Sequence, residues 1–304
     1  MSNRPPHSIA VHGGAGRASA DPAHAQRAAE GLRAALAAGG DLLAAGGSAL
    51  EAVVAAVREL ERCEVFDAGR GSVLDSDGHV ALDAAVMEGA ARRAGGVVGV
   101  ARIAQPIDAA LAVLREGRHV LLAGDGAERF ARAAGLAMVE PDYHILPERR
   151  AQLARVIGER ARAGGGTVGA VARDAAGHLA AATSTGGLVA RHPGRVADSA
   201  LPGSGIWADD ATCAVSATGV GEFFIRAGFA RDVDARVRYA GRDLATACAE
   251  ALAGVAALGG SGGCIALAAQ GDAVFHFDTP EMPRGVRAGG EAPRIAIHGR
   301  GDPA

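Results

Sequence analysis

The spacing of apolar and polar positions predicts alternating strands and helices up to about position 134. Helical spacing indicates helices at about 21–38, 48–62, 106–115 and 128–134, and short apolar runs indicate strands at 8–11, 80–86 and 120–123. The first two helices carry start signals, because Asp21 precedes Pro22 and Ser48 stands three residues before Glu51. The Gly39-Gly40 pair is expected to end the first helix.

Beyond position 167 the pattern becomes rich in strands. Strands are predicted at 168–173, 179–185, 212–218, 263–269 and 273–277, and helices at about 222–239 and 243–258. The turn at 174–177 joins the first two of these strands as a hairpin. Hairpins with helices before and after them are typical of antiparallel sheets layered with helices. No internal repeat or sharp domain boundary is visible, so we expect a single domain over residues 1–304.

Between these two parts, residues 141–166 are polar and rich in arginine. The last third of this segment has no apolar face, which predicts an exposed and mobile linker. A connection of this length inside a compact domain usually has a functional reason, and an exposed processing site is one such reason.

Composition narrows the class of protein. Hydrophobic residues make up 49% of the 304 residues and aromatic residues only 3%, so we expect helices and sheets to pack closely through small side chains. The net charge of −3 comes from mixed acidic and basic residues, which argues against nucleic acid as an obligate partner.

The cysteines and the apolar runs of the chain indicate the cellular compartment in which the protein is expected. Cys63, Cys213, Cys248 and Cys264 form no C-x-x-C pair and have no zinc-like spacing, so we expect free thiols in a reducing environment. The first residues contain no apolar signal segment, and no apolar run approaches the roughly 18 residues of a transmembrane helix. These features predict a cytoplasmic protein without a membrane partner.

Thr167 follows three glycines and begins a strand-like run. If the Gly166–Thr167 bond were cut, Thr167 would carry both a hydroxyl nucleophile and a free α-amine. An α-amine titrates at about 7.7–8.0, so at neutral pH it can accept the proton of the hydroxyl. On local sequence alone, a flexible turn before an ordinary strand is the commoner reading.

Three further clusters carry polar groups that suit a site near Thr167. The run Thr-Ser-Thr-Gly-Gly at 183–187 ends the strand expected to pair with the one that Thr167 begins, which brings its hydroxyls within reach. Arg195 and Asp198 either form a surface ion pair or bind the carboxylate and ammonium of an amino-acid substrate. The run 217–222 joins a strand to a helix, where backbone N–H groups and the Thr218 hydroxyl suit an anion or a developing oxyanion. Neither a Walker lysine nor a full G-x-G-x-x-G accompanies it, which argues against a dinucleotide site.

In this order, the segments resemble the plant-type L-asparaginase and isoaspartyl peptidase family of N-terminal-nucleophile hydrolases. The resemblance spans almost the whole chain, and its most specific part is GTVGAVA at 166–172 with TSTGG at 183–187. The other matching stretches are 12–16, 66–71, 82–84, 87–89, 181–182, 194–196, 198–199, 218–219, 221–222, 282 and 284–285.

The resemblance implies an α+β fold, a four-layer αββα sandwich of two mainly antiparallel sheets between helix layers. It also implies a precursor that cuts itself into residues 1–166 and 167–304, which stay together and pair as a homodimer of αβ units. The implied substrates are β-aspartyl (isoaspartyl) dipeptides and the side-chain amide of L-asparagine, cleaved through a covalent β-aspartyl-enzyme. The small-molecule reaction needs no organic cofactor.

The resemblance also implies a role for each matching site residue. Thr167, freed by cleavage after Gly166, would be the nucleophile, and Thr185 would orient it. Thr218 and Gly219 would stabilise the oxyanion. The substrate's α-carboxylate and α-amine would be bound in a pocket formed by Arg195, Asp198 and Gly221.

A structural sodium ion is often bound in this family by backbone carbonyls. The matching segment here lies around Leu60, Glu61, Phe66 and Ala68.

The chain departs from the family's usual pattern near the substrate end. Asp67 stands where asparagine is usual, and a carboxylate next to the oxyanion would weaken its stabilisation unless protonated. Residues 197–200 read Ala-Asp-Ser-Ala where Gly-Asp-Ser-Pro is usual. Two alternatives therefore stay open: a glycosylasparaginase-like amidase with an N-terminal threonine, and an unprocessed protein of the same fold that binds a small ligand.

Overall fold

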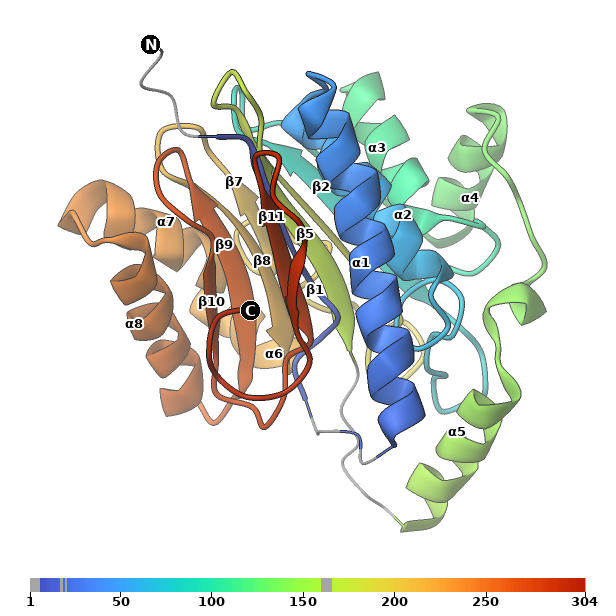
Figure 1. Cartoon of the computed structure of the whole chain (residues 1–304). Coiled ribbons are helices and arrows are strands. Elements are labelled where there is room, and N and C mark those ends of the chain that lie inside the picture. The colour runs from blue at the N-terminus through green and yellow to red at the C-terminus, as the bar shows by residue number, and fades with distance from the viewer. Residues whose placement is uncertain (1–5, 17–18, 20, 160–165, 304) are drawn as a thin grey trace.

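The computed structural model describes residues 6–16, 19, 21–159 and 166–303, which form two sheets flanked by helices (Figure 1). Neighbouring strands of the larger, eight-stranded sheet are antiparallel, except for one parallel pair at an edge. In order across the sheet, its strands are β12 (Arg294–Ala296), β11 (Arg284–Ala288), β1 (Ser8–His12), β5 (Thr167–Arg173), β6 (Leu179–Thr185), β2 (Leu82–Glu88), β3 (Ala94–Val100) and β4 (Leu121–Ala123).

The smaller sheet packs face to face on the larger one. Its four antiparallel strands are, in order, β10 (Val274–Phe277), β9 (Gly262–Ala268), β8 (Cys213–Gly219) and β7 (Ile206–Ala208). Apolar side chains of β1, β5 and β6 share one core with those of β7, β8 and β9. The sheets approach so closely that a Cβ on Gly169 would lie 1.9 Å from Ser216 Oγ, so only glycine fits at that position.

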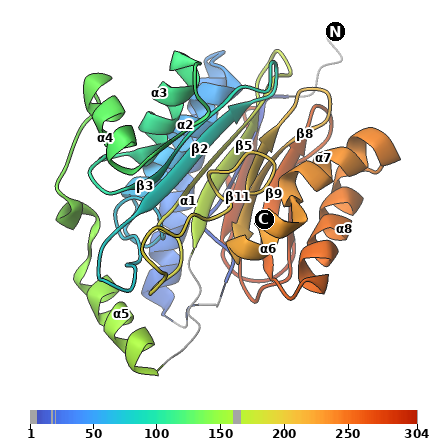
Figure 2. The same cartoon turned by 180° about the vertical axis from the view of Figure 1, so that it is seen from behind.

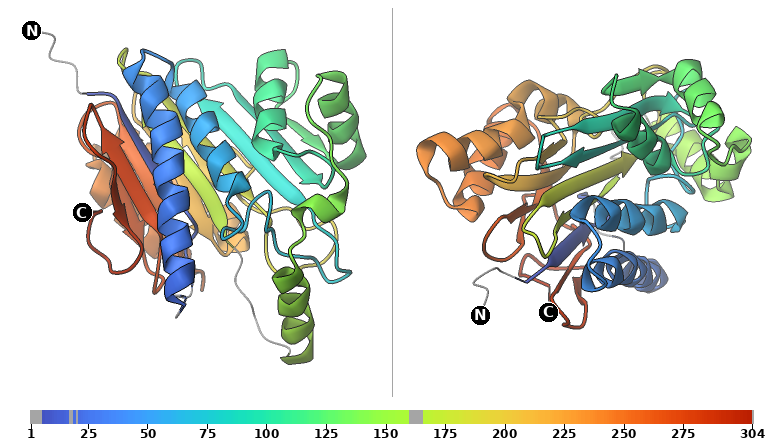
Figure 3. Two further views of the ribbon diagram at one scale, coloured as in Figure 1. Left: turned by 45° about the vertical axis from the view of Figure 1, so that its right-hand side comes forward. Right: turned by 90° about the horizontal axis from the view of Figure 1, so that it is seen from above.

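Helices cover the outer face of each sheet, as the views in Figures 2 and 3 show. The larger sheet carries α1 (Pro22–Ala44), α2 (Ala49–Arg62) and α3 (Pro106–Glu116), with α4 (Gly124–Ala133) next to β3 and β4. The smaller sheet carries α6 (Gly221–Ala227), α7 (Phe229–Ala240) and α8 (Leu244–Ala257). The predicted α+β class is confirmed.

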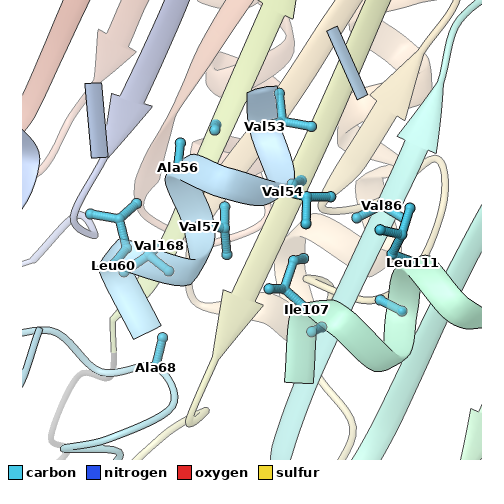
Figure 4. Packing of buried hydrophobic residues seen from close by; sticks show 14 of the residues in the cluster. Val53, Val54, Ala56, Val57, Leu60, Ala68, Val86, Ile107, Leu111 and Val168 are labelled. Atoms are coloured by element: carbon cyan, nitrogen blue, oxygen red, sulfur yellow. The ribbon is translucent and has the colours of Figure 1, made fainter. Parts of the chain in front are cut away.

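The core beneath α2 and α3 fixes the start of β5. Figure 4 shows aliphatic side chains of both helices packed against β2 and β5, with Val168 among them. Because successive side chains of a strand point to opposite faces, burial of Val168 on the helix side directs Thr167 toward the smaller sheet. The helix that covers this core begins with the predicted capping box of Ser48 and Glu51.

The Gly39-Gly40 pair does not end the first helix, which continues to Ala44. A Cβ on Gly39 would lie 2.3 Å from Ile9 Cδ1 and 2.8 Å from the carbonyl oxygen of Ala52. Glycine here allows α1 to approach β1 and α2 closely, so tertiary packing outweighs its weak helix propensity.

Residues 141–159 of the predicted linker are largely helical. A short 3-10 helix, η1 (Pro141–His144), leads into α5 (Pro147–Glu159). Leu153 and Val156 of α5 are buried against a small apolar cluster that includes Val73 and Leu74. Two apolar residues three positions apart lie on one face of a helix and can dock it. In a polar sequence they are too few to reveal that face. The predicted linker's residues 160–165 lie outside the described part of the chain.

Several strands were not predicted from the sequence: β3, β7, β11 and β12. Two of them have only three residues, and β3 contains Gly95, Gly96 and Gly99, which obscure the alternation expected of a strand. Among the described helices, none is both long enough and apolar enough to cross a membrane.

Candidate active site

Thr167 is the first residue of β5, near the middle of the larger sheet, and only 6% of it is exposed. The hairpin register places it directly opposite Thr185 of β6, and the predicted hydroxyl-rich strand end does lie within its reach. Its hydroxyl donates to Thr185 Oγ1 at 3.2 Å and shares a second hydrogen bond, also 3.2 Å, with Ser199 Oγ. The Thr167 oxygen is thus held between two other buried hydroxyls.

The peptide bond before Thr167 is held from several sides. The Thr185 hydroxyl donates to the carbonyl oxygen of Gly166 at 2.7 Å, and the Gly166 N–H donates to Asp67 Oδ2 at 2.7 Å. Gly14 also lies beside this bond. Its backbone has a φ of +104°, a conformation that glycine adopts with little strain. A Cβ on Gly14 would lie 3.2 Å from Gly166 Cα and 3.3 Å from the Thr167 nitrogen. Any larger residue at position 14 would therefore crowd the Gly166–Thr167 bond.

Thr218 and Gly219 end β8 of the smaller sheet. Thr218 contacts the N-terminal loop that contains Gly14 and Ala15. Thr218 Oγ1 accepts a hydrogen bond of 3.1 Å from the N–H of Ala15, the residue after Gly14. Gly219 has a φ of +157°, and a Cβ there would lie 2.5 Å from the carbonyl oxygen of Ser261. The strand-to-helix turn predicted to face an anion therefore adjoins the loop that contacts Thr167.

Arg195, Asp198 and Gly221 lie together, and the predicted alternative of an Arg195–Asp198 ion pair is not what forms. The Arg195 guanidinium makes a two-pronged ion pair with Glu222, at 2.8 and 2.9 Å. Asp198 is buried, and its Oδ2 has no hydrogen-bond partner among the described residues. A Cβ on Gly221 would lie 2.6 Å from Asp198 Oδ1 and 3.2 Å from Arg195 Nη2, so glycine keeps this pocket open.

The buried carboxyl of Asp198 has an altered protonation equilibrium. Burial raises its pKa to about 7, although Arg195 acts in the opposite direction. Near neutral pH this carboxyl is therefore close to half-ionised, and a cation beside it would favour the carboxylate.

His12 lies between the two sheets beneath Thr167. Its Nε2 is 2.8 Å from Ser216 Oγ, and its Nδ1 accepts from the N–H of Gly14 at 3.3 Å. Burial lowers its pKa to about 3, so the imidazole is neutral at physiological pH. This histidine supports the loop that contacts the Gly166–Thr167 bond.

Asp67, predicted as a neighbour of the oxyanion, contacts the Gly166 side of the bond. Its Oδ2 accepts from Gly166 and its Oδ1 accepts from the N–H of Val73 at 2.8 Å. Burial raises the pKa of this carboxyl, and the nearby Arg149 guanidinium opposes that rise. A cavity of about 310 Å³ adjoins it, lined among others by Gly14, Gly166 and Arg149.

Sequence reasoning did not assign roles to Ser199 or Glu222, which the structure places in contact with Thr167 and Arg195. Both were inside stretches that carried the resemblance, directly after Asp198 and Gly221. Their positions next to assigned residues were the available signal. No group of three or more His, Cys, Asp or Glu side chains suited to a metal occurs within the described residues.

A buried threonine hydroxyl beside a Gly–Thr bond, with a polar pocket nearby, on an α+β fold of two sheets, is an arrangement suited to a hydrolase. The model of the asparaginase family matches residues 6–297, and the chain belongs to this family. The predicted resemblance is confirmed.

Relatives cover nearly the full length of the chain. An isoaspartyl peptidase of Salmonella typhimurium is 45% identical over 306 residues, covering 95% of this chain and 98% of its own. An isoaspartyl peptidase of Escherichia coli is 43% identical, covering 95% of both chains. A plant-type L-asparaginase of Pyrobaculum calidifontis is 38% identical, covering 93% of this chain and 97% of its own.

Proposed function

We propose that this protein is an isoaspartyl peptidase with L-asparaginase activity, which cuts itself before Thr167 to become active. The carrying observation is the Gly166–Thr167 bond, with the Thr167 hydroxyl bonded to Thr185 and Thr185 bonded to the Gly166 carbonyl. The similarity to isoaspartyl peptidases over almost the whole chain supports the substrate class.

In the self-cleavage step, Thr167 Oγ1 attacks the carbonyl carbon of Gly166. The C–N bond to Thr167 breaks as the C–O bond forms, and the hydroxyl proton ends on the nitrogen, which becomes a free α-amine. Water then hydrolyses the resulting ester, which frees the Gly166 carboxylate and restores the hydroxyl. The hydrogen bond from Thr185 polarises the carbonyl that is attacked.

In the substrate reaction, the same hydroxyl attacks the side-chain carbonyl of a β-aspartyl group. The α-amine of Thr167 takes the hydroxyl proton and transfers it to the departing nitrogen, since amines of this type titrate at about 7.7–8.0. Water then releases aspartate from the enzyme ester. The products are aspartate and either an amino acid or ammonia.

The oxyanion of this reaction would be stabilised at the end of β8. Thr218 Oγ1 already accepts a hydrogen bond from Ala15, which leaves its own proton available for donation. The N–H of Gly219 would supply a second donor. One such donor typically contributes about 10²–10³ in rate.

The substrate's α-carboxylate and α-ammonium would bind at Arg195 and Asp198. Arg195 commits Nε and Nη2 to Glu222, and Nη1 makes no hydrogen bond with the described residues. The unpartnered Oδ2 of Asp198 matches an ammonium group. Gly221 leaves room for the substrate between these two groups.

The larger assembly is also part of the proposal. We expect a four-layer αββα sandwich, cut into residues 1–166 and 167–304, that pairs as a homodimer of αβ units without an organic cofactor. The four free cysteines support a reducing compartment, the cytoplasm.

A structural sodium ion near the end of α2 is a further part of the proposal. The Glu61 carbonyl accepts from the Arg70 N–H at 2.8 Å, and the Phe66 carbonyl lies 3.5 Å from Arg149 Nη2. Each carbonyl oxygen has a second lone pair, so these groups, with Leu60 and Ala68, can still hold a cation. The ion would stiffen this loop and take no part in the chemistry.

Intact-mass measurement of the purified chain tests the proposal. Two fragments that meet at Gly166 and Thr167, together with hydrolysis of β-Asp-Leu and L-asparagine, are expected. A chain that stays whole after long incubation and binds aspartate without hydrolysis would instead favour the ligand-binding alternative. Release of aspartate from a glycosylated asparagine, with no action on β-Asp-Leu, would favour the glycosylasparaginase-like alternative.

A further inference from the structure

The cavity of about 310 Å³ beside the Gly166–Thr167 bond has no task in the reaction described so far. Its lining includes Gly166 and the loop 13–16, together with residues of α5. Within the described residues, this lining is separate from the pocket that Arg195, Asp198 and Gly221 form. Its volume lies at the lower end of the roughly 300–1,000 Å³ typical of small-molecule sites, which suits a ligand the size of one amino acid.

The proposed reaction places the leaving group at this cavity. The α-amine of Thr167 gives a proton to the departing nitrogen, so that nitrogen must lie within hydrogen-bond reach of the Thr167 nitrogen. In the uncut chain the Thr167 nitrogen is bonded to Gly166, and a Cβ on Gly14 would lie 3.3 Å from it. Both glycines line the cavity. With the aspartyl half bound at Arg195 and Asp198, the leaving residue of a β-Asp-X dipeptide would therefore extend into this cavity.

Helix α5 presents a basic face to the cavity. Arg149, Gln152 and Arg155 follow one another at intervals of three residues, so they share one side of the helix, and all three line the cavity. Leu153 and Val156 dock the same helix on the body of the protein. The arginine-rich segment thus holds positive charge next to the Gly166–Thr167 bond.

Arg149 is held in place before any ligand binds. Its Nε donates to the Gly71 carbonyl at 2.6 Å and its Nη1 donates to Gln152 Oε1 at 3.0 Å. Among the described residues, Nη2 has only a long contact of 3.5 Å, to the Phe66 carbonyl. A guanidinium stays charged at physiological pH and suits carboxylates, and a side chain that is already ordered loses little entropy on binding. Nη2 is therefore the group that can meet an anionic ligand.

The acidic residues of the lining already have partners. Asp67 accepts from the N–H groups of Val73 and Gly166, at 2.8 and 2.7 Å. Glu281 is buried, and its Oε2 lies 2.7 Å from His298 Nδ1. The charge that a ligand meets in this cavity therefore comes mainly from the two arginines of α5.

We propose that this cavity is the subsite for the leaving residue of a β-aspartyl dipeptide, and that Arg149 binds the free α-carboxylate of that residue. This inference rests on the proposed function. An amino-acid leaving group carries this carboxylate, whereas the ammonia released from asparagine has no such group. The subsite thus makes dipeptides with a free carboxyl end the preferred substrates.

The test compares β-Asp-Leu with β-Asp-leucinamide, which differ only in the charge of the leaving residue's carboxyl group. The measured quantity is the preference, the ratio of kcat/KM for the two substrates, on enzyme shown by intact mass to be fully cut. Wild type is expected to prefer β-Asp-Leu by about tenfold or more, mainly through KM, because the amide loses a hydrogen bond between charged groups. In Arg149→Gln the preference should fall close to one.

Arg150→Gln is the matched control. Arg150 is the next residue of α5, but it is exposed, its Nη2 donates to Asp142 at 3.0 Å, and it does not line the cavity. It should keep the wild-type preference. Arg155→Gln is a second variant in the subsite, because Arg155 is exposed and its replacement leaves the Arg149 contact with Gly71 intact. It should lower the preference by a smaller factor than Arg149→Gln.

The preference is a ratio within one protein, so a general loss of activity in a variant cancels. A preference lost in Arg149→Gln and kept in Arg150→Gln supports the subsite. Equal kcat/KM of wild type for the dipeptide and its amide overturns it, and so does a wild-type preference that Arg149→Gln retains. If Arg149→Gln is not cut, a wild-type preference that Arg155→Gln leaves unchanged overturns it as well. Wild type that hydrolyses neither substrate nor asparagine refutes the proposed function, which is a different result.

Discussion

Asp198→Asn should make the protein more stable at the same time as it removes substrate binding. The buried Asp198 carboxyl has an oxygen without a partner among the described residues, so its ionised form lowers the free energy of unfolding. Binding of the substrate's ammonium would offset this loss. An asparagine has almost the same shape and carries no charge. It should therefore remove the cost while leaving the surrounding packing intact.

The size and the sign of the effect follow from the pKa of Asp198. Folding raises it from 3.8 to about 7. Below pH 3.8 the carboxyl is protonated in both states, and no cost arises. As the pH rises toward 7 the unfolded chain ionises first, so the wild type loses stability relative to the variant. At about 1.4 kcal/mol per pKa unit, Asp198→Asn should gain about 2 kcal/mol at pH 5 and about 4 kcal/mol at pH 8.

The assay is thermal unfolding at pH 5 and pH 8, with both proteins in a Thr167→Ala background so that each unfolds as one chain. An entropy of unfolding of about 2.1 cal/mol/K per residue converts 4 kcal/mol to roughly 6 °C at pH 8, and the gain at pH 5 should be about half of that. Other buried carboxyls, such as Glu61 with its pKa raised to about 8, are present in both proteins and cancel in the difference.

Asp75→Asn is the control for this experiment. Asp75 is similarly buried, but its Oδ1 accepts from the backbone N–H groups of Asp77 and His79, so the substitution should bring no gain. A gain at Asp198 that does not change with pH, or a variant less stable than wild type at pH 8, would refute the reasoning.

Four further outcomes are expected. Thr167→Ala should stay uncut and show no hydrolysis; two fragments on a denaturing gel would remove Thr167 as nucleophile. Ser199→Ala should lower kcat about tenfold with little change in KM, because it removes one hydroxyl that holds Thr167 Oγ1; a KM effect alone would contradict this. Gly221→Ala should raise KM by about 100-fold or more but allow self-cleavage, since its Cβ would meet Asp198; an unchanged KM would show that the substrate binds elsewhere. For wild type, kcat/KM for β-Asp-Leu should fall as the pH drops below about 8, first because the Thr167 α-amine becomes protonated and then because Asp198 does; a profile flat from pH 8 to 5 would exclude both the amine as base and Asp198 as the ammonium ligand.

Local signals in the sequence were sufficient for the hairpin and the helix starts. The strands at 168–173 and 179–185 flank a short turn, which sets the register that places Thr167 opposite Thr185. The Ser48 capping box is also local. Such features depend on neighbours a few residues apart, so a single sequence carries them.

Local signals failed where buried contacts outweigh propensity. Gly39 reads as a helix end, yet α1 continues past it to Ala44, and Ile9 and Ala52 leave no space for a side chain at this position. Leu153 and Val156 dock α5 in a segment that reads as a polar linker. In both cases the deciding partner comes from a distant part of the chain.

The sequence by itself determined which chemical groups this protein has: a threonine after glycines, a hydroxyl-rich partner strand, and the arginine and aspartate of a binding pocket. Only the tertiary structure decided what each group contacts. It pairs Arg195 with Glu222 and not with Asp198, sets Ser199 against Thr167, and joins Asp67 to Gly166 across 99 positions of the chain. Such pairings form because burial removes water and leaves each polar group to find a partner in space, and sequence spacing does not encode that choice.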